Sequence, residues 1–121
     1  MFLATSNQAK QLLCLTYASR VSPEELQRGH EDVRVLLAGL SPGFRLLVDL
    51  SQVESIDLDC APEIGRLMDM TDQAGVGLVV RVIPDPDKDI GMNILAVFHY
   101  PHHPRIVTCD NLTEAMRALW L

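Results

Sequence analysis

The sequence of 121 residues is poor in positive charge, aromatic side chains and cysteine. Ten lysine and arginine residues are outnumbered by 16 aspartate and glutamate residues, which gives a formal net charge of −6. A broad basic face is therefore not expected, and this argues against nucleic acids and anionic membrane surfaces as partners. The cysteines, Cys14, Cys60 and Cys109, are odd in number and lack a close pair, which favours a reducing compartment over a disulfide framework.

Long apolar segments are also missing. No stretch reaches the roughly 18 consecutive apolar residues of a membrane span. Residues Met1 to Lys10 lack the basic region and following apolar region of a secretion signal. These absences predict a cytoplasmic protein. No linker, repeat or low-complexity tract divides the chain, so we expect a single domain over residues 1–121.

The short motifs of common α/β enzymes are absent as well. The sequence contains no GxGxxG, no GxxxxGK[ST], no HExxH and no GxSxG, which excludes the usual dinucleotide, nucleotide, zinc-protease and hydrolase signatures. We therefore expect a protein that is not an enzyme, with no catalytic residue and no cofactor.

Apolar runs and helix signals alternate regularly along the chain. Apolar runs predict strands over 12–17, 46–50, 78–83 and 105–109, each followed or preceded by a helical pattern. The run 46–50 is almost continuously apolar, which is typical of a central strand covered by helices on both faces. This order predicts an α/β fold with a mostly parallel sheet of four or five strands and about four helices. Residues 1–9 form either a frayed tail or an edge strand through 2–5.

Capping residues and apolar stripes define the expected helices. Ser22, Pro23 and Glu25 predict a capping box at the start of the first helix, and Asn111 predicts a cap for the last. The second helix is expected to place Arg66, Asp69 and Asp72 toward solvent. The expected buried faces are Leu26, His30, Val33, Leu37 and Leu40 in the first helix, Ile64, Leu67, Met68 and Thr71 in the second, Ile90, Ile94, Val97 and Phe98 in the third, and Leu112, Ala115, Met116 and Leu119 in the fourth.

A histidine-rich segment precedes the last predicted strand. His99, Tyr100, His102 and His103 flank a proline, but a zinc site usually takes three or four ligands from separate elements. We interpret this segment as a solvated turn and expect no metal site. The alternative is a small-molecule or lipid-binding domain, or a minor enzyme. Its pocket would lie between the third and fourth helices and be lined by Ile94 and Phe98, with His99, Tyr100, His102 and His103 at its mouth.

Two further groups of chemically active side chains lie before the second helix. A helix N-terminus can activate a thiol such as that of Cys60, but the nearby carboxylates of Asp57 and Asp59 oppose thiolate formation. A packed, inert cysteine is the favoured interpretation, and Cys14 is expected in the core with Cys109 partly exposed. The two aspartates either cap the helix or pair to share a proton or hold a cation. Local chemistry favours capping.

The run from Leu46 to Asp57 resembles the STAS domain, the family of sulfate transporters and anti-sigma factor antagonists. Members of that family show an apolar strand, Asp-Leu-Ser, a few residues, and then Ile-Asp-Ser-Ser-Gly at the start of a helix. Asp49-Leu50-Ser51 and Ile56-Asp57 match this pattern, and residues 110–119 resemble the closing helix of the family. The resemblance covers roughly the whole chain in element order. It implies a bacterial regulatory module that binds a kinase-like anti-sigma factor or another regulator, and it leaves homodimer formation open.

The resemblance also assigns roles to residues 57–60. Asp57 matches the Asp of the family motif, Leu58 its first Ser, Asp59 the phosphorylated Ser and Cys60 the Gly. No hydroxyl is present at position 59, so the usual serine switch cannot operate there. A carboxylate with about one charge stands where the family carries a phosphate with roughly 1.5 to 2 charges. The implied partner surface is Ser55, Asp57, Leu58, Asp59, Cys60 and Glu63.

Overall fold

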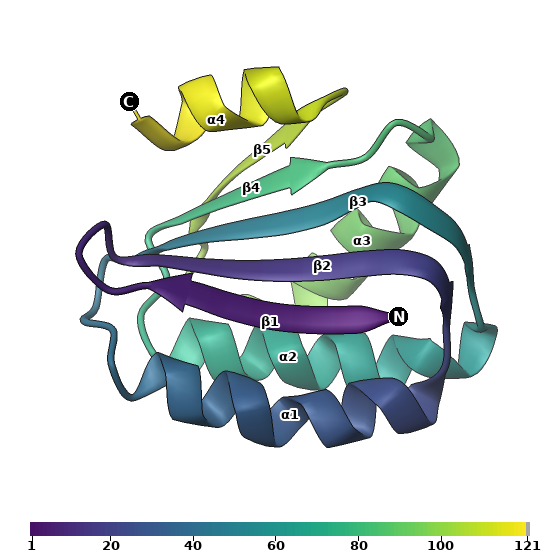
Figure 1. Ribbon diagram of the computed structural model, residues 1–121, viewed down its shortest axis with the longest axis horizontal. Helices are drawn as coiled ribbons and strands as arrows, with labels where there is room; N and C mark the ends of the chain where they lie inside the picture. The colour runs from purple at the N-terminus through teal and green to yellow at the C-terminus, as the bar shows by residue number, and fades with distance from the viewer. Residues whose placement is uncertain (121) are drawn as a thin grey trace.

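The computed structural model describes residues 1–120, apart from the side chains of residues 86, 88 and 89. Strands and helices alternate along the chain after an initial pair of strands (Figure 1). A short 3₁₀ turn, Leu58–Cys60, joins the third strand to the second helix. The elements are β1 (Phe2–Asn7), β2 (Leu12–Val21), α1 (Pro23–Leu37), β3 (Arg45–Ile56), α2 (Ala61–Gln73), β4 (Leu78–Val82), α3 (Pro86–His99), β5 (Arg105–Cys109) and α4 (Leu112–Trp120).

The strands form one sheet in the order β1-β2-β3-β4-β5. Only β1 and β2 are antiparallel, and the other neighbours are parallel. This confirms the predicted mostly parallel α/β fold. The structure also resolves the alternative left open for the first residues, because Phe2–Asn7 is an edge strand paired with β2.

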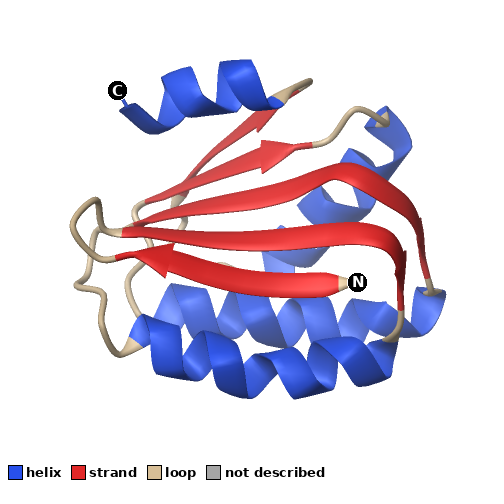
Figure 2. Cartoon of the chain, in the orientation of Figure 1, coloured by secondary structure: helices blue, strands red, loops and turns tan. Residues whose placement is uncertain are grey.

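Helices cover the two faces of the sheet unequally. In Figure 2, α1, α2 and α3 lie on one face and α4 alone lies on the other. Leu46, Val48 and Leu50 of β3 join the core under the three helices, while Leu47 joins the smaller core under α4. The prediction that 46–50 is an inner strand is therefore confirmed. Helix α4 packs on β3, β4 and β5, so the same face of β1 and β2 is left largely uncovered.

Strands β2 and β3 continue well beyond their predicted ends. Their parallel pairing runs from Leu12 opposite Arg45 to Val21 opposite Ile56, whereas β3 and β4 pair only as far as Asp49 opposite Val82. The sequence did not predict this extension because residues 51–56 alternate between exposed and half-buried positions and form no apolar run. The overhanging end of β3 carries the 3₁₀ turn past the end of β4.

The predicted helix caps are present. The Ser22 side chain accepts a hydrogen bond from the Glu25 amide at 3.4 Å, and Asn111 Oδ1 accepts one from the Glu114 amide at 2.9 Å. The Glu114 carboxylate also accepts from the Asp110 amide at 3.3 Å. The Glu25 carboxylate does not complete its capping box, because it faces the amino group of Met1 at 3.4 Å.

Two of the predicted helix faces hold and two need correction. All four expected core residues of α2 are buried, and Leu26 and Val33 anchor α1, where His30 and Leu37 are half-buried. Leu40 is also half-buried but lies after the end of α1 at Leu37. In α4 only Ala115 and Leu119 are buried, whereas Leu112 is 43% exposed and Met116 is 41% exposed. The prediction for α3 is wrong: the residues expected in the core are exposed, namely Ile90, Ile94, Val97 and Phe98.

The error in α3 has a physical cause. Met92 and Ala96 are the α3 residues that enter the core, and Leu95 is half-buried. Because α3 carries apolar residues on nearly all sides, periodicity alone does not select its buried face. A second error concerns Asp72, which was expected on the solvent side of α2. It is only 5% exposed because the turn after α3 covers it.

A charge placed on the inner strand tests this architecture. Val48→Asp is expected to lower the free energy of unfolding by several kcal/mol, because an unpaired carboxylate would replace an apolar side chain in the core. Urea unfolding of this variant should be compared with Val35→Asp, since Val35 lies on α1 and is 58% exposed. Equal stability of the two variants would contradict the placement of Val48.

Candidate functional site

The turn between β3 and α2 exposes two side chains and is held in place by its backbone. The Asp57 amide donates to the carbonyl of Val21 at 3.3 Å, and the Cys60 amide donates to the carbonyl of Asp57 at 2.9 Å. The buried Cys60 anchors the turn from below. Leu58 is 94% exposed, and Asp59 is exposed beside it.

Neither aspartate of this turn caps a helix through its side chain. The capping interpretation favoured by local chemistry is therefore wrong. The 3₁₀ turn runs directly into α2, so backbone carbonyls of Asp57 and Leu58 accept from the amides of Cys60 and Ala61. Side-chain caps are not needed there. The Asp57 carboxylate lies 3.9 Å from Arg20 Nε, while Asp59 has no hydrogen-bond or ion-pair partner within residues 1–120 as described.

Cys60 is a packed structural residue. Its thiol donates to the carbonyl of Val21 at a distance of 3.6 Å. Burial raises the pKa of the Cys60 thiol, and the charge of Asp57 raises it further. The predicted packed position of Cys60 is thus confirmed, and its lack of reactivity stays a prediction. Cys109 was expected to be partly exposed but is only 7% exposed, because Ala115 and Leu119 of α4 pack in the same cluster.

A groove lies beside the exposed turn, between the end of β3, the start of α2 and the side of α3 that carries Gly91, Ile94 and Leu95. It encloses about 370 Å³ and is lined almost entirely by apolar groups, with Asp57 as the charged exception among the described lining residues. We call it the α3 groove. Its wall includes Ile56, Leu58, Ile64, Gly91, Ile94 and Leu95.

A stripe of exposed apolar residues continues from this groove along α3. Ile90 is 60% exposed, Ile94 57%, Val97 77% and Phe98 75%. We call these four residues the α3 stripe. The apolar spacing of the sequence predicts these four residues in the core, so it does not predict their exposure at the surface. The available signal was that α3 contains more apolar residues than one buried face requires.

The residues predicted to line a ligand pocket are not brought together. Ile94 lines the α3 groove, Phe98 is exposed, and the phenol of Tyr100 is buried against Thr71 with their oxygens 3.2 Å apart. His99 Nδ1 lies 2.7 Å from the Asp69 carboxylate. Helices α3 and α4 lie on opposite faces of the sheet, as Figure 1 shows, so they cannot form a pocket between them.

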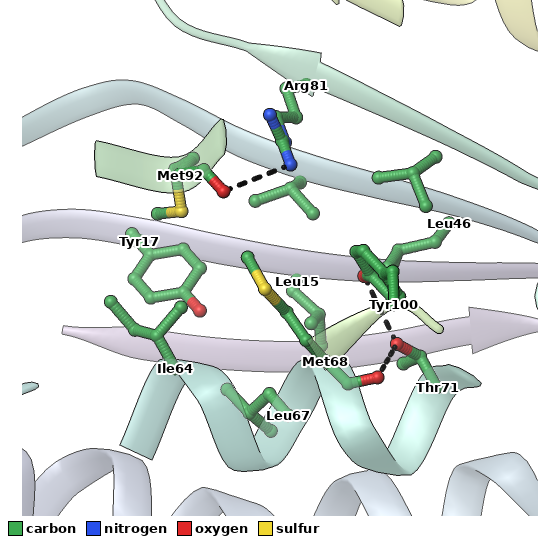
Figure 3. Close-up of a pocket in the computed structure, with 12 residues that line it drawn as sticks. Leu15, Tyr17, Leu46, Ile64, Leu67, Met68, Thr71, Arg81, Met92 and Tyr100 are labelled. Carbon is green, nitrogen blue, oxygen red and sulfur yellow. Dashed lines mark hydrogen bonds between the residues drawn. The ribbon is translucent and has the colours of Figure 1, made fainter. Parts of the chain in front are cut away.

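The interior under α3 is closed, and Tyr100 also borders a separate open groove of about 370 Å³ with Val97 and His103. Figure 3 shows the cavity under α3, which offers about 20 Å³, room for one water molecule and not for an organic ligand. Arg81 is 1% exposed and donates to the Asn93 side chain at 2.6 Å and to the carbonyl of Met92 at 3.5 Å. Burial raises the pKa of both phenols there, Tyr17 and Tyr100.

The histidine-rich segment is a turn attached to α2. His102 Nδ1 lies 2.7 Å from the buried carboxylate of Asp72, which also accepts from the His102 amide at 3.3 Å. With the pair of His99 and Asp69, this fixes both ends of the turn. His103 adopts a positive φ of 51° and is exposed. No group of three or more potential metal ligands occurs within the described part of the chain.

Comparison with known proteins gives a fold but no family by sequence. No family model and no curated protein sequence matches the chain. Ten solved chains match in structure. An uncharacterised protein from Shewanella loihica with a SpoIIAA-like fold is 14% identical, with a TM-score of 0.72 over 98% of this chain and 92% of that one.

Two other similar structures are regulatory proteins. The anti-sigma factor antagonist SpoIIAA in its unphosphorylated form is 10% identical, with a TM-score of 0.64 over 99% of this chain and 98% of that one. An anti-sigma factor antagonist from Mycobacterium paratuberculosis is 16% identical, with a TM-score of 0.62 over 100% of this chain and 94% of that one. The chain therefore has the SpoIIAA-like fold, which confirms the resemblance to STAS-like domains at the level of structure. None of the described helices is long and apolar enough to cross a membrane.

Alanine substitutions of one glycine in α2 and one in α3 test how tightly the histidine turn is packed. A Cβ added to Gly65 would lie 2.5 Å from His99 Nε2, whereas one added to Gly91 would meet no atom within 4 Å. Gly91→Ala is expected to stabilise the protein by up to about 1 kcal/mol, the usual gain in helix propensity. Gly65→Ala should destabilise it by displacing His99 from Asp69. Urea unfolding of both variants measures this, and equal stabilities would contradict the packing described.

Thiol reactivity tests the burial of the three cysteines. Burial is the leading cause that raises the pKa of Cys14, Cys60 and Cys109, so little thiolate is present near neutral pH and reactivity should increase with pH. Only Cys14 is half-buried, and it should react first with a thiol reagent in the folded protein. The other two should react after unfolding in guanidinium. Fast modification of Cys60 in the folded protein would contradict this account.

Proposed function

We propose that this chain is a cytoplasmic bacterial regulatory module that acts by binding a protein and not by catalysis. The observation that carries the proposal is the exposed carboxylate of Asp59, which makes no cap and no ion pair among the described residues. The turn around it is closed by its backbone and by Cys60, so no hydrogen bond of the turn depends on the Asp59 side chain. An exposed charge that makes no cap and no ion pair, on a turn that the backbone holds, is suited to recognition by a partner.

The fold supports the kind of function proposed. Two of the similar structures are anti-sigma factor antagonists, and one of them was determined in an unphosphorylated form. In the resemblance to STAS domains, Asp59 occupies the position of the phosphorylated serine. We propose that its carboxylate presents a permanent negative charge, so the surface is set in one state. Its partner would be a kinase-like anti-sigma factor or a similar regulator.

The surroundings of Asp59 fit a protein partner. Leu58 is almost fully exposed beside it, and the apolar α3 groove begins at the same turn. Burying a leucine side chain contributes roughly 1.5 to 3 kcal/mol, and exposed apolar patches commonly mark interaction sites. Ser55, Asp57, Cys60 and Glu63 complete the proposed surface, with Cys60 buried as its support.

Glu63 links the proposed surface to α1. Its Oε1 atom accepts from Gln27 at 3.1 Å, while its buried Oε2 atom lies 3.5 Å from His30 Nε2 without a hydrogen bond. His30 instead lies 3.2 Å from the backbone carbonyl of Glu63. The distances favour the backbone contact as the main role of His30. Glu63 therefore orients the start of α2 and contributes less to partner contact than Leu58 and Asp59.

Charge and structure can be separated at position 59. Asp59→Asn is expected to leave thermal stability nearly unchanged, because no cap or ion pair is lost, and to weaken partner binding by about tenfold or more, since a charged hydrogen bond contributes roughly 1.5 to 3 kcal/mol. Asp59→Ser should lose binding equally. Asp32→Asn, at an exposed position on α1, is the matched control.

Capture from a lysate and thermal melting should be measured on all variants in parallel. The proposal predicts proteins that the parent and Asp32→Asn retain and that both Asp59 variants lose. Equal recovery of the same proteins by the parent, Asp59→Asn and Asp59→Ser would overturn the recognition of this charge.

A further inference from the structure

We propose that the α3 groove and the α3 stripe together dock an amphipathic helix with basic residues on its polar side. This inference rests on the proposed function, because it names the chemistry of the partner segment that binds beside Asp59. It concerns a surface that the sequence assigned to the core.

Helix α3 has two apolar sides, and only one of them is covered. Met92 and Ala96 face the core, whereas the α3 stripe faces outward. A helix that is apolar all round is normally buried on all sides. Four large apolar side chains are exposed at successive turns of one helix and share its outward side, so they are not scattered singly over the surface. An exposed apolar group of this kind marks an interaction site.

The spacing of the apolar residues on α3 indicates the shape of the partner segment that would pack on them. Ile90, Ile94 and Val97 follow each other at spacings of four and three, which is the spacing of a seam between two packed helices. Gly91 lies next to this seam, and the space where its side chain would be is empty. The missing side chain opens the α3 groove, which accepts a residue projecting from an incoming helix. The surface therefore fits a helix better than an extended strand.

The surface around the α3 groove also carries negative charge. Asp57 lies in the wall of the groove, Asp59 is exposed on the same turn, and Asp87 is exposed one turn of α3 before Gly91. Arg20 lies 3.9 Å from Asp57, but Asp59 and Asp87 have no cationic partner among the described residues. No described cationic side chain lines the groove. The net charge of −6 of the whole chain disfavours an anionic bilayer and a second copy of the chain as the partner, and the aspartates at this surface complement lysine or arginine.

Two synthetic helical peptides test the proposal. They share one leucine stripe, and the polar side carries lysine in one peptide and glutamate in the other. Fluorescence anisotropy with the full chain should show binding of the lysine peptide that weakens with added salt, and at least tenfold weaker binding of the glutamate peptide. Ile94→Ser and Gly91→Leu should each weaken binding of the lysine peptide at least tenfold. Gly91→Leu should weaken binding because its side chain fills the groove. The fold tolerates this side chain, since a Cβ added at Gly91 meets no atom within 4 Å.

Val35→Ser is the matched control, because Val35 is 58% exposed on α1 and Ile94 is 57% exposed on α3. It should bind the lysine peptide as the parent does, and circular dichroism should show all variants folded. Equal binding of the two peptides, or an equal loss in Val35→Ser and Ile94→Ser, would overturn the proposal. Ile94-dependent binding to phosphatidylglycerol vesicles, or an Ile94-dependent dimer, without binding of the lysine peptide would also overturn it, in favour of a bilayer or a second copy.

The outcome separates this inference from the proposed function. If the Asp59 variants lose captured proteins while the two peptides bind alike, only the basic-helix inference fails. If the lysine peptide binds as expected while Asp59→Asn retains every captured protein, only the recognition of the Asp59 charge fails.

Discussion

The parallel pairing of β2 with β3 is the constraint on which the rest of the structure depends. It is longer than the pairing of β3 with β4, running to Val21 opposite Ile56 while the neighbouring pair ends at Asp49 opposite Val82. The first half of β3 is buried between two layers of helices and holds the core. Its second half overhangs the sheet and places the turn at Leu58 and Asp59 next to α3. The candidate site exists because β3 both contributes to the core and positions the turn at Leu58 and Asp59.

The fold could be predicted where the burial or capping of a segment produces a simple pattern of residues in the sequence. The almost continuously apolar run 46–50 indicated a strand covered on both faces, and Ser22 and Asn111 indicated helix starts. Each of these signals can be recognised within a short stretch of sequence. The extension of β3 was not predictable in this way. Residues 51–56 are held by pairing with a partner strand, and their sequence lacks an apolar run.

The site itself was predicted only in part. The motif resemblance located the turn at 57–60, but local chemistry assigned its carboxylates to helix capping, which the backbone hydrogen bonds of the 3₁₀ turn make unnecessary. The α3 stripe was mistaken for core because apolar spacing does not distinguish a buried face from a binding face. Asp72 shows the converse error, since a carboxylate is rarely buried without a partner and His102 lies far from it in sequence. Both errors concern contacts between distant segments.

The central claim is that the turn at Leu58 and Asp59 and the outer side of α3 form one partner surface. Amide hydrogen exchange of the chain, free and saturated with a captured partner that depends on Asp59, tests it most directly. The account predicts that new protection is concentrated in residues 57–64 and 90–98, with α4 and β5 unchanged. Protection confined to α4, β5 or the uncovered face of β1 and β2 would contradict it.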